Sequence, residues 1–300
     1  MTEARARVVV GVDGSAATAP ALEWAAGEAA RRNLPLELLH ARVEELGATV
    51  GALAPARREQ RVATATKDLV PCLEEARRRV EAGWPGLEVS VRVATLGAPY
   101  ALVTASAGAA MVAVGARGRS LARRVLLGSV SHHVAAHARC PAVVVKRTAG
   151  DPQMPVVVGI DDTTTSHDTL EVAVEEALAR GVPLVAVHAW VDPAISGYGI
   201  WAAPPDVEVE LRRSAERLLT DTLEGWTRKH PDLEIHERLV RAHPVDVLLG
   251  AAEHCQLLVV GSHGLGAFPG MLIGSVASAV VQHADCPVVV VPARAGRSGA

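Results

Sequence analysis

Two glycine-rich stretches of this chain have the residue types and the spacing that can hold a phosphate group. Gly115-Ala-Arg-Gly118 is followed, after nine intervening residues, by Gly128-Ser129, and Gly261-Ser-His-Gly264 is followed in the same way by Gly274-Ser275. A glycine-rich turn between a strand and a helix exposes main-chain N–H groups, and the helix dipole adds positive potential there. The repeated spacing therefore predicts two nucleotide sites that arose by duplication.

An aspartate follows a valine-rich run in each half of the chain. Arg7-Val-Val-Val-Gly-Val12 precedes Asp13, and Pro155-Val-Val-Val-Gly-Ile160 precedes Asp161. Continuous apolar runs of this kind are typical of parallel strands that are buried on both faces. Ligands of parallel sheets bind beyond the carboxyl ends of the strands. We therefore expect the aspartate and the glycine turn of each half to meet in one crevice.

The remaining sequence alternates between helical and strand patterns, in the same order in both halves. Helices are expected at Ala17–Arg32, 56–82, 99–107, Ser166–Arg180, 205–230 and 244–252, with one more before each last strand. Further strands are expected at Pro35–Ala41, Glu88–Ala94, Ala110–Val114, Ala142–Lys146, Pro183–Ala189, Glu234–Val240, Gln256–Val260 and Val288–Val291. This alternation predicts two repeated Rossmann-like, doubly wound α/β domains, each with a five-stranded parallel sheet in the order 3-2-1-4-5 and helices on both faces.

The repeat also sets the expected domain boundaries. Residues 1–147 form the first nucleotide-binding domain, 148–154 a linker, 155–292 the second nucleotide-binding domain and 293–300 a flexible tail. A loop at 192–205, which contains two glycines and three prolines, is long for its position and is expected over the second crevice.

Composition excludes several classes of protein. The net charge of −3 gives no general attraction to nucleic acid or to anionic lipid, and aromatic residues at 3% are too few for stacking on single-stranded nucleic acid. The longest apolar runs are too short to span a bilayer. The N-terminus lacks a secretory pattern, and the four cysteines show no disulfide framework. A cytoplasmic location is expected, with no nucleic-acid partner and no membrane partner.

Each candidate residue also has a purely structural interpretation. The glycine turns could be tight connections without a ligand. Asp13 could cap the following helix, but Ser15 or Thr18 can do so instead, which would leave Asp13 free. His40 and His188 are expected to be packed or hydrogen-bonded rather than catalytic.

Two more sets of side chains leave alternatives open. His137-x2-Cys140 and His283-x2-Cys286 have zinc-ligand types, but each cysteine is better explained as a small buried side chain before a proline. Arg117 and His263 lie inside the glycine turns, where they could contact phosphate or be solvated.

The combined pattern resembles the universal stress protein family. The resemblance rests on the acid after strand one, the Gly-x2-Gly-x9-Gly-Ser spacing, and the segments His137-Ala-Arg-Cys-Pro141 and His283-Ala-Asp-Cys-Pro287. The chain looks like a tandem member of the actinobacterial type. The resemblance implies a stress-response protein that binds ATP, with Mg²⁺ on the phosphates, and that forms a homodimer. It implies no established catalysis beyond weak ATP hydrolysis in some members.

The family's site residues carry over onto both halves, with no catalytic residue and no protein metal ligand among them. In the first half they are Gly11, Asp13, Gly14, Ser15, Ala41, Gly115, Arg117, Gly118, Gly128 and Ser129. In the second half they are Gly159, Asp161, Ala189, Gly261, His263, Gly264, Gly274 and Ser275. The aspartates and the second-strand ends would serve the nucleoside, and the glycine turns would hold ribose and phosphates.

The halves depart from the family pattern in different ways. Asp162 adds a carboxylate beside the second site, which repels phosphate, whereas Arg119, Arg123 and Arg124 lie in the nine-residue loop of the first. We therefore expect the first half to bind ATP more tightly. In the opposite direction, Ala116 stands where the family usually has serine, which Ser262 keeps.

Three function hypotheses remain. The chain has neither the Gly-Lys dipeptide of a P-loop nor the Gly-x-Ser-x-Gly motif of a nucleophile elbow. The first hypothesis is therefore an ATP-dependent sensor or switch with an unknown protein partner. The second is a slow metal-dependent ATPase or phosphotransferase, and the third is an interaction module with vestigial sites.

The apolar last strands of the two halves would be bare sheet edges, so we expect them to pair and a homodimer to form.

Overall fold

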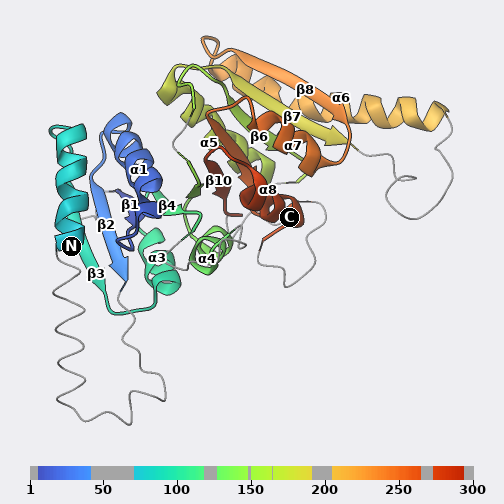
Figure 1. The fold of residues 1–300 in the computed structure, drawn as a ribbon. Helices are drawn as coiled ribbons and strands as arrows, with labels where there is room; N and C mark the ends of the chain where they lie inside the picture. The colour runs from blue at the N-terminus through green and yellow to red at the C-terminus, as the bar shows by residue number, and fades with distance from the viewer. Residues whose placement is uncertain are drawn as a thin grey trace, which may run out of the picture. The chain divides into compact units, whose positions relative to one another are not determined.

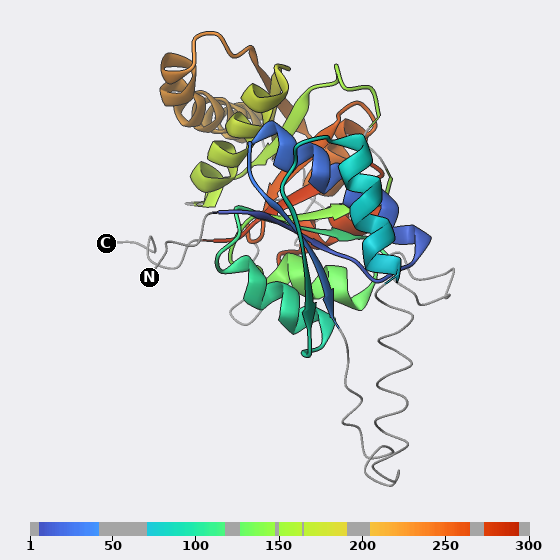
Figure 2. The same ribbon diagram turned by 90° about the vertical axis from the view of Figure 1, so that its left-hand side faces the viewer.

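The structure is a computed structural model that describes residues 6–41, 71–117, 127–147, 150–163, 165–190, 205–264 and 273–293. The chain divides into two compact units, Met1–Thr148 (unit 1) and Ala149–Ala300 (unit 2). Figures 1 and 2 show that each unit is built from one sheet with helices around it.

Unit 1 contains five parallel strands in the spatial order β3-β2-β1-β4-β5. The strands are β1 (Val8–Gly11), β2 (Leu36–Ala41), β3 (Val89–Ala94), β4 (Met111–Gly115) and β5 (Ala142–Val145). The helices are α1 (Ala19–Arg31), α3 (Ala98–Ser106) and α4 (Ser129–His137), with a 3-10 turn η1 (Ala16–Thr18) and a helix over residues 71–83. Figure 2 shows α3 and α4 together on one face of this sheet, with α1 and the helix at 71–83 on the other.

Unit 2 repeats this arrangement with parallel strands in the order β8-β7-β6-β9-β10. Its strands are β6 (Val156–Ile160), β7 (Leu184–Trp190), β8 (Ile235–Arg241), β9 (Leu257–Gly261) and β10 (Val288–Val291). Its helices are α5 (Thr165–Arg180), α6 (Pro205–Lys229), α7 (Pro244–Ala252) and α8 (Ser275–His283). Counted along the chain, both units have the order 3-2-1-4-5, which confirms the predicted fold class.

The central strands form the cores because their side chains are apolar on both faces. Val8, Val9 and Val10 of β1 are fully buried, and Leu257, Leu258 and Val259 of β9 are buried as completely. In a parallel sheet covered by helices on both faces, β-branched and leucine side chains pack against the helices above and below. The strand ends that follow these core residues are therefore fixed in position, and they carry the predicted site residues.

Element boundaries differ from the sequence expectations by a residue or two, and one difference has a clear cause. The helix expected from Ala17 begins as the 3-10 turn η1, and the α-helix proper starts at Ala19 with a proline in its first turn. Proline lacks an N–H, which costs nothing in a first helical turn. The first part of the helix expected at 56–82, and most of the loop expected at 192–205, lie outside the described residues.

The segment before β6 is tied to unit 2 by one side chain. The Nε2 group of Gln256 donates hydrogen bonds to the carbonyl oxygens of Pro152, at 2.7 Å, and Met154, at 2.6 Å. Because Gln256 is itself buried, it fixes the end of the expected linker onto the start of β9. None of the helices in the described ranges is both long enough and apolar enough to cross a lipid bilayer.

Candidate functional site

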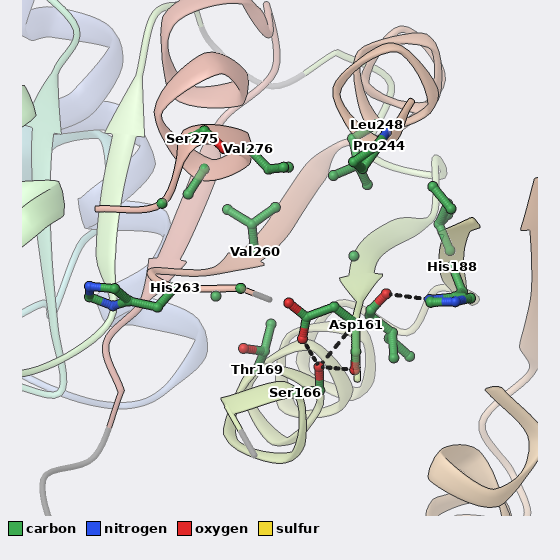
Figure 3. Close-up of a pocket in the computed structure, with 18 of the residues that line it drawn as sticks. Asp161, Ser166, Thr169, His188, Pro244, Leu248, Val260, His263, Ser275 and Val276 are labelled. Carbon is green, nitrogen blue, oxygen red and sulfur yellow. Dashed lines mark hydrogen bonds between the residues drawn. The ribbon is translucent and has the colours of Figure 1, made fainter. Parts of the chain in front are cut away.

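A cavity of about 330 Å³ lies at the carboxyl ends of the unit 2 strands. The ends of β6, β7 and β9 and the starts of α7 and α8 supply its walls (Figure 3). Such a volume is within the range of small-molecule sites. In Figure 3, Ser275 and Val276 lie on one side of the cavity, and Asp161 and Ser166 lie on the opposite side.

Asp161 is held by hydroxyl groups from its own loop. Its Oδ1 atom accepts hydrogen bonds from the Thr163 hydroxyl and from the Ser166 hydroxyl, the latter at 2.7 Å. Ser166 Oγ also lies 3.0 Å from the main-chain nitrogen of Asp161. These contacts fix the carboxylate in one orientation at the cavity wall, because Ser166 belongs to the buried first turn of α5.

The glycine turn after β9 brings main chain against the Asp161 side chain. A Cβ atom placed on Gly264 would lie 2.6 Å from Oδ2 of Asp161, so only glycine fits there without a shift. The turn is closed by a hydrogen bond from the Gly274 amide to the Ser262 carbonyl, at 2.7 Å. This bond places the first turn of α8 beside the end of β9.

The start of α8 has the properties of an anion site. Gly274 is its N-cap residue and, as a glycine, offers no side chain to cap the helix. The first amides of a helix have no partner within the helix, and they carry its positive dipole end. Since Ser275, Val276 and Ala277 line the cavity, this group of amides lies at its wall.

Two histidines complete the wall on the β7 and α7 side. The buried His188 ring places Nδ1 2.8 Å from the Ile160 carbonyl, and His40 makes the same contact with the Val12 carbonyl at 2.6 Å in unit 1. The prediction that these histidines are packed or hydrogen-bonded is therefore confirmed. His243 caps α7, because its Nδ1 atom accepts the Val245 amide.

The structure brings all the predicted second-half residues around this one cavity: Gly159, Asp161, Ala189, Gly261, His263, Gly264, Gly274 and Ser275. Their roles in binding stay predictions. The prediction that the aspartate after the first strand and the glycine turn meet in one crevice is confirmed for unit 2. Sequence reasoning missed Ser166 and Thr169 of α5. The spacing could have found Ser166, because it follows Asp161 by as many residues as Thr18 follows Asp13.

Unit 1 has the same main-chain hydrogen bond between the N-cap glycine of its last helix and the glycine turn. The Gly128 amide donates to the Ala116 carbonyl at 2.8 Å, and α4 also begins without a side-chain cap. A Cβ atom on Gly115 would lie 3.0 Å from the Ala17 carbonyl oxygen, so the turn packs tightly against η1. Three parallel strands of unit 1 have their carboxyl ends side by side, at Gly11, Ala41 and Gly115. Arg117 follows the last of these strands, β4. Gly118 lies outside the described residues, as does most of the nine-residue loop.

The expectation that Ser15 or Thr18 caps a helix and leaves Asp13 free is wrong. Neither side chain caps η1 or α1. Instead, Oδ1 of Asp13 accepts the Ser15 amide at 2.8 Å, the Ser15 hydroxyl at 2.7 Å and the Thr18 hydroxyl at 2.6 Å. Hydroxyl groups donate preferentially to a carboxylate, because charge-assisted hydrogen bonds are stronger. Asp13 is thus held as firmly as Asp161, with Gly14 beside it at a φ of 80°.

Two further features of the site are the orientation of His263 and the metal ligands available among the described residues. The His263 ring points away from Asp161 (Figure 3), and its Nδ1 atom lies 3.0 Å from the Ser262 hydroxyl. Among the described residues, no three histidine, cysteine or carboxylate side chains gather in a geometry that could hold a metal ion.

The model of the universal stress protein family matches residues 5–146 and again 154–292. A universal stress protein of Mycolicibacterium smegmatis is 37% identical over 300 residues, covering 96% of this chain and 97% of that protein. Universal stress protein Rv1996 of Mycobacterium tuberculosis is 37% identical over 297 residues, covering 94% of each. The crystal structure of a universal stress protein from Archaeoglobus fulgidus superposes with a TM-score of 0.68 at 18% identity, covering 98% of both chains.

Proposed function

The chain belongs to the universal stress protein family, a stress-response family, and we propose that it is a nucleotide-dependent sensor whose ligand is ATP. One observation carries the proposal. In unit 2, the uncapped start of α8, the glycine turn after β9 and the fixed carboxylate of Asp161 all line one cavity. A site that combines main-chain amides with a carboxylate suits a ligand that has both phosphates and sugar hydroxyls.

The two chemical ends of ATP would use different walls of the cavity. The amides at the start of α8 and along the glycine turn would donate to phosphate oxygens. Asp161, as an acceptor, would receive hydrogen bonds from the ribose hydroxyls, because a carboxylate repels phosphate. The apolar surface of Val187, Ala189 and Leu248 would face the base.

The ionisable groups of this cavity favour binding over turnover. Asp161 accepts two hydroxyl groups, and His188 contacts the Ile160 carbonyl. His243 caps α7, and the Nδ1 atom of His263 lies 3.0 Å from the Ser262 hydroxyl. A general base needs a proton acceptor aimed at the attacking water. Because these groups already serve the protein itself, we propose a sensor whose bound state a partner protein recognises.

The two sites are expected to differ in affinity. We propose that unit 1 binds ATP more tightly, since its nine-residue loop carries three arginines and the unit 2 loop carries no charged residue. Asp162 is exposed, so solvent screens part of its repulsion of phosphate. Titrations of Asp13→Asn and Asp161→Asn separate the sites, and the loss of the tighter phase in Asp161→Asn would reverse the assignment.

Isothermal titration calorimetry on nucleotide-free protein tests the proposal. ATP, AMP and cyclic AMP are titrated separately, with and without Mg²⁺. We expect ATP to bind at one or two sites per chain and AMP to bind more weakly, because AMP offers a single phosphate to the amides. Absence of heat with all three nucleotides, in protein whose fold is verified by circular dichroism, would overturn the proposal. The homodimer stays a prediction that light scattering at micromolar concentration tests.

A further inference from the structure

Two cysteines of unit 2 lie within reach of one another. The Sγ atoms of Cys255 and Cys286 are 3.6 Å apart. Both thiols are free in the structure, Cys255 is buried, and Cys286 is partly exposed. A disulfide needs a sulfur–sulfur distance of about 2.05 Å, so an approach of roughly 1.5 Å would join them.

The fold itself places these residues together. Cys255 comes just before β9 and Cys286 just before β10, and these parallel strands pair from Leu258 opposite Val288 onwards. Counted back from this register, Gln256 and not Cys255 would lie opposite Cys286, so strand register alone does not make the contact. The two sulfurs meet in the segments that lead into the amino ends of these neighbouring strands.

The environment gives the two sulfurs different roles. Cys255 donates its S–H to Cys286, and this hydrogen bond lowers the pKa of the Cys286 thiol, although burial opposes the effect. The same hydrogen bond, together with burial, raises the pKa of the Cys255 thiol. Since the thiolate is the reactive form and Cys286 is the more exposed, Cys286 is the sulfur that an oxidant reaches first.

We propose that Cys255 and Cys286 are a redox-modifiable pair that forms a disulfide when the protein meets hydrogen peroxide. The Cys286 thiolate attacks the peroxide oxygen, the O–O bond breaks, and Cys286 sulfenic acid and one water form after proton uptake. The Cys255 sulfur then attacks the Cys286 sulfur, the S–O bond breaks, and a second water leaves. In sum, two thiols and one hydrogen peroxide give one disulfide and two waters.

The disulfide would close a segment that contains part of the candidate nucleotide site. Residues between Cys255 and Cys286 include β9, the glycine turn and α8. The cysteines lie at the amino ends of β9 and β10, whereas the cavity lies at the carboxyl ends. Oxidation would therefore restrain this segment in the unfolded chain without placing sulfur in the cavity. The proposal does not depend on ATP binding.

Unit 1 provides a matched control within the same chain. At the corresponding repeat positions it has Ala109 and Cys140, so the pair is missing one sulfur. Burial raises the pKa of the Cys140 thiol to about 12. Cys140 should therefore stay reduced under conditions that oxidise Cys286.

Peptide mapping of the full, reduced chain tests the proposal. The protein is treated with a small excess of hydrogen peroxide, blocked with N-ethylmaleimide under denaturing conditions and cleaved before aspartate residues. Cleavage at Asp246 and Asp285 puts the two cysteines into separate peptides. We expect these peptides to be linked, with Cys72 and Cys140 alkylated and the link lost on reduction.

A variant isolates the first step of the reaction. Cys255→Ser keeps a hydrogen-bond donor beside Cys286 but removes the second sulfur, so it should stop at Cys286 sulfenic acid, which a dimedone probe labels. Alkylation of both Cys255 and Cys286 in peroxide-treated wild-type protein would overturn the proposal. So would oxidation of Cys286 to sulfinic acid while Cys255 stays alkylated. The wild-type result decides the question even if the variant fails to fold.

Discussion

The Oδ2 atom of Asp161 lies where a side chain on Gly264 would have to begin, 2.6 Å from the position of its Cβ atom. The end of β6 and the glycine turn thus meet at a contact where any residue larger than glycine would force the carboxylate to shift. Oδ1 of Asp161 is already held by Thr163 and Ser166, so the carboxylate cannot move without losing those hydrogen bonds. The position of the acid and the identity of the glycine therefore depend on one another.

Gly264→Ala should displace the Asp161 carboxylate and weaken ATP binding in unit 2. We expect a loss of about tenfold or more in affinity, which corresponds to about 1.4 kcal/mol. Calorimetry with ATP measures it in an Asp13→Asn background, which weakens the unit 1 site.

The control for this variant is Gly250→Ala. Gly250 lies in α7 with nothing within 4 Å of an added Cβ atom, so alanine should leave ATP affinity unchanged and favour the helix. Equal ATP affinities for Gly264→Ala and Gly250→Ala would show that the contact with Asp161 has no part in binding.

Gln256→Met should loosen the segment before β6. Methionine keeps the buried volume but removes both hydrogen bonds to the Pro152 and Met154 carbonyls. We expect unit 2 to lose about 1–2 kcal/mol of stability, because the carbonyls are only partly buried and can bind water. Urea unfolding measures the loss, and proteolysis near residues 150–154 should accelerate. An unchanged free energy of unfolding would show that these hydrogen bonds do not stabilise the segment before β6.

The thiol of Cys140 should show a distinctive pH dependence. Burial raises its pKa to about 12 in the folded protein, from an ordinary value of 9.0. Between about pH 9 and pH 12 the folded state keeps the thiol proton, whereas the unfolded state has lost it. The free energy of unfolding therefore falls as the pH rises through this range. Iodoacetamide at pH 8 should modify Cys140 only after urea is added. Rapid modification of the folded protein would show that the thiol is accessible.

Sequence reasoning was most accurate where burial alone decides structure. The run Val288–Val291 forms β10 with the same ends as predicted, and α7 covers the predicted residues 244–252. A short run of valines favours a strand, because β-branched side chains pack well on a sheet whose two faces are covered by helices. The duplicated order of elements then fixes the sheet, because parallel crossovers are right-handed.

Side-chain partners were harder to predict, because they depend on atoms that sequence spacing does not place. Ser15 or Thr18 was expected to be able to cap the helix in place of Asp13, yet both donate to Asp13. Cys286 was interpreted as a small buried side chain before a proline, and its contact with Cys255 appears only once β9 and β10 are neighbours in the sheet. Thr169 of α5 was missed for the same reason, whereas the spacing from Asp161 could have found Ser166.

The central claim is that main-chain amides at the starts of α4 and α8 bind the phosphates of ATP. Ser129 and Ser275 are the first residues of these helices, and the preceding glycines have extended backbone, with ψ of 155° and 153°. Proline fits after such a residue and at the first helical position, where it removes only one N–H. The double variant Ser129→Pro/Ser275→Pro therefore tests the amides, and Ser129→Ala/Ser275→Ala controls for the lost hydroxyls.

The decisive measurement is the ATP affinity of these two double variants by calorimetry, with circular dichroism to verify the fold. The account predicts that the alanine variant binds within about twofold of wild type and that the proline variant binds about tenfold or more weakly. ATP binding by the folded proline variant that equals wild type would contradict it.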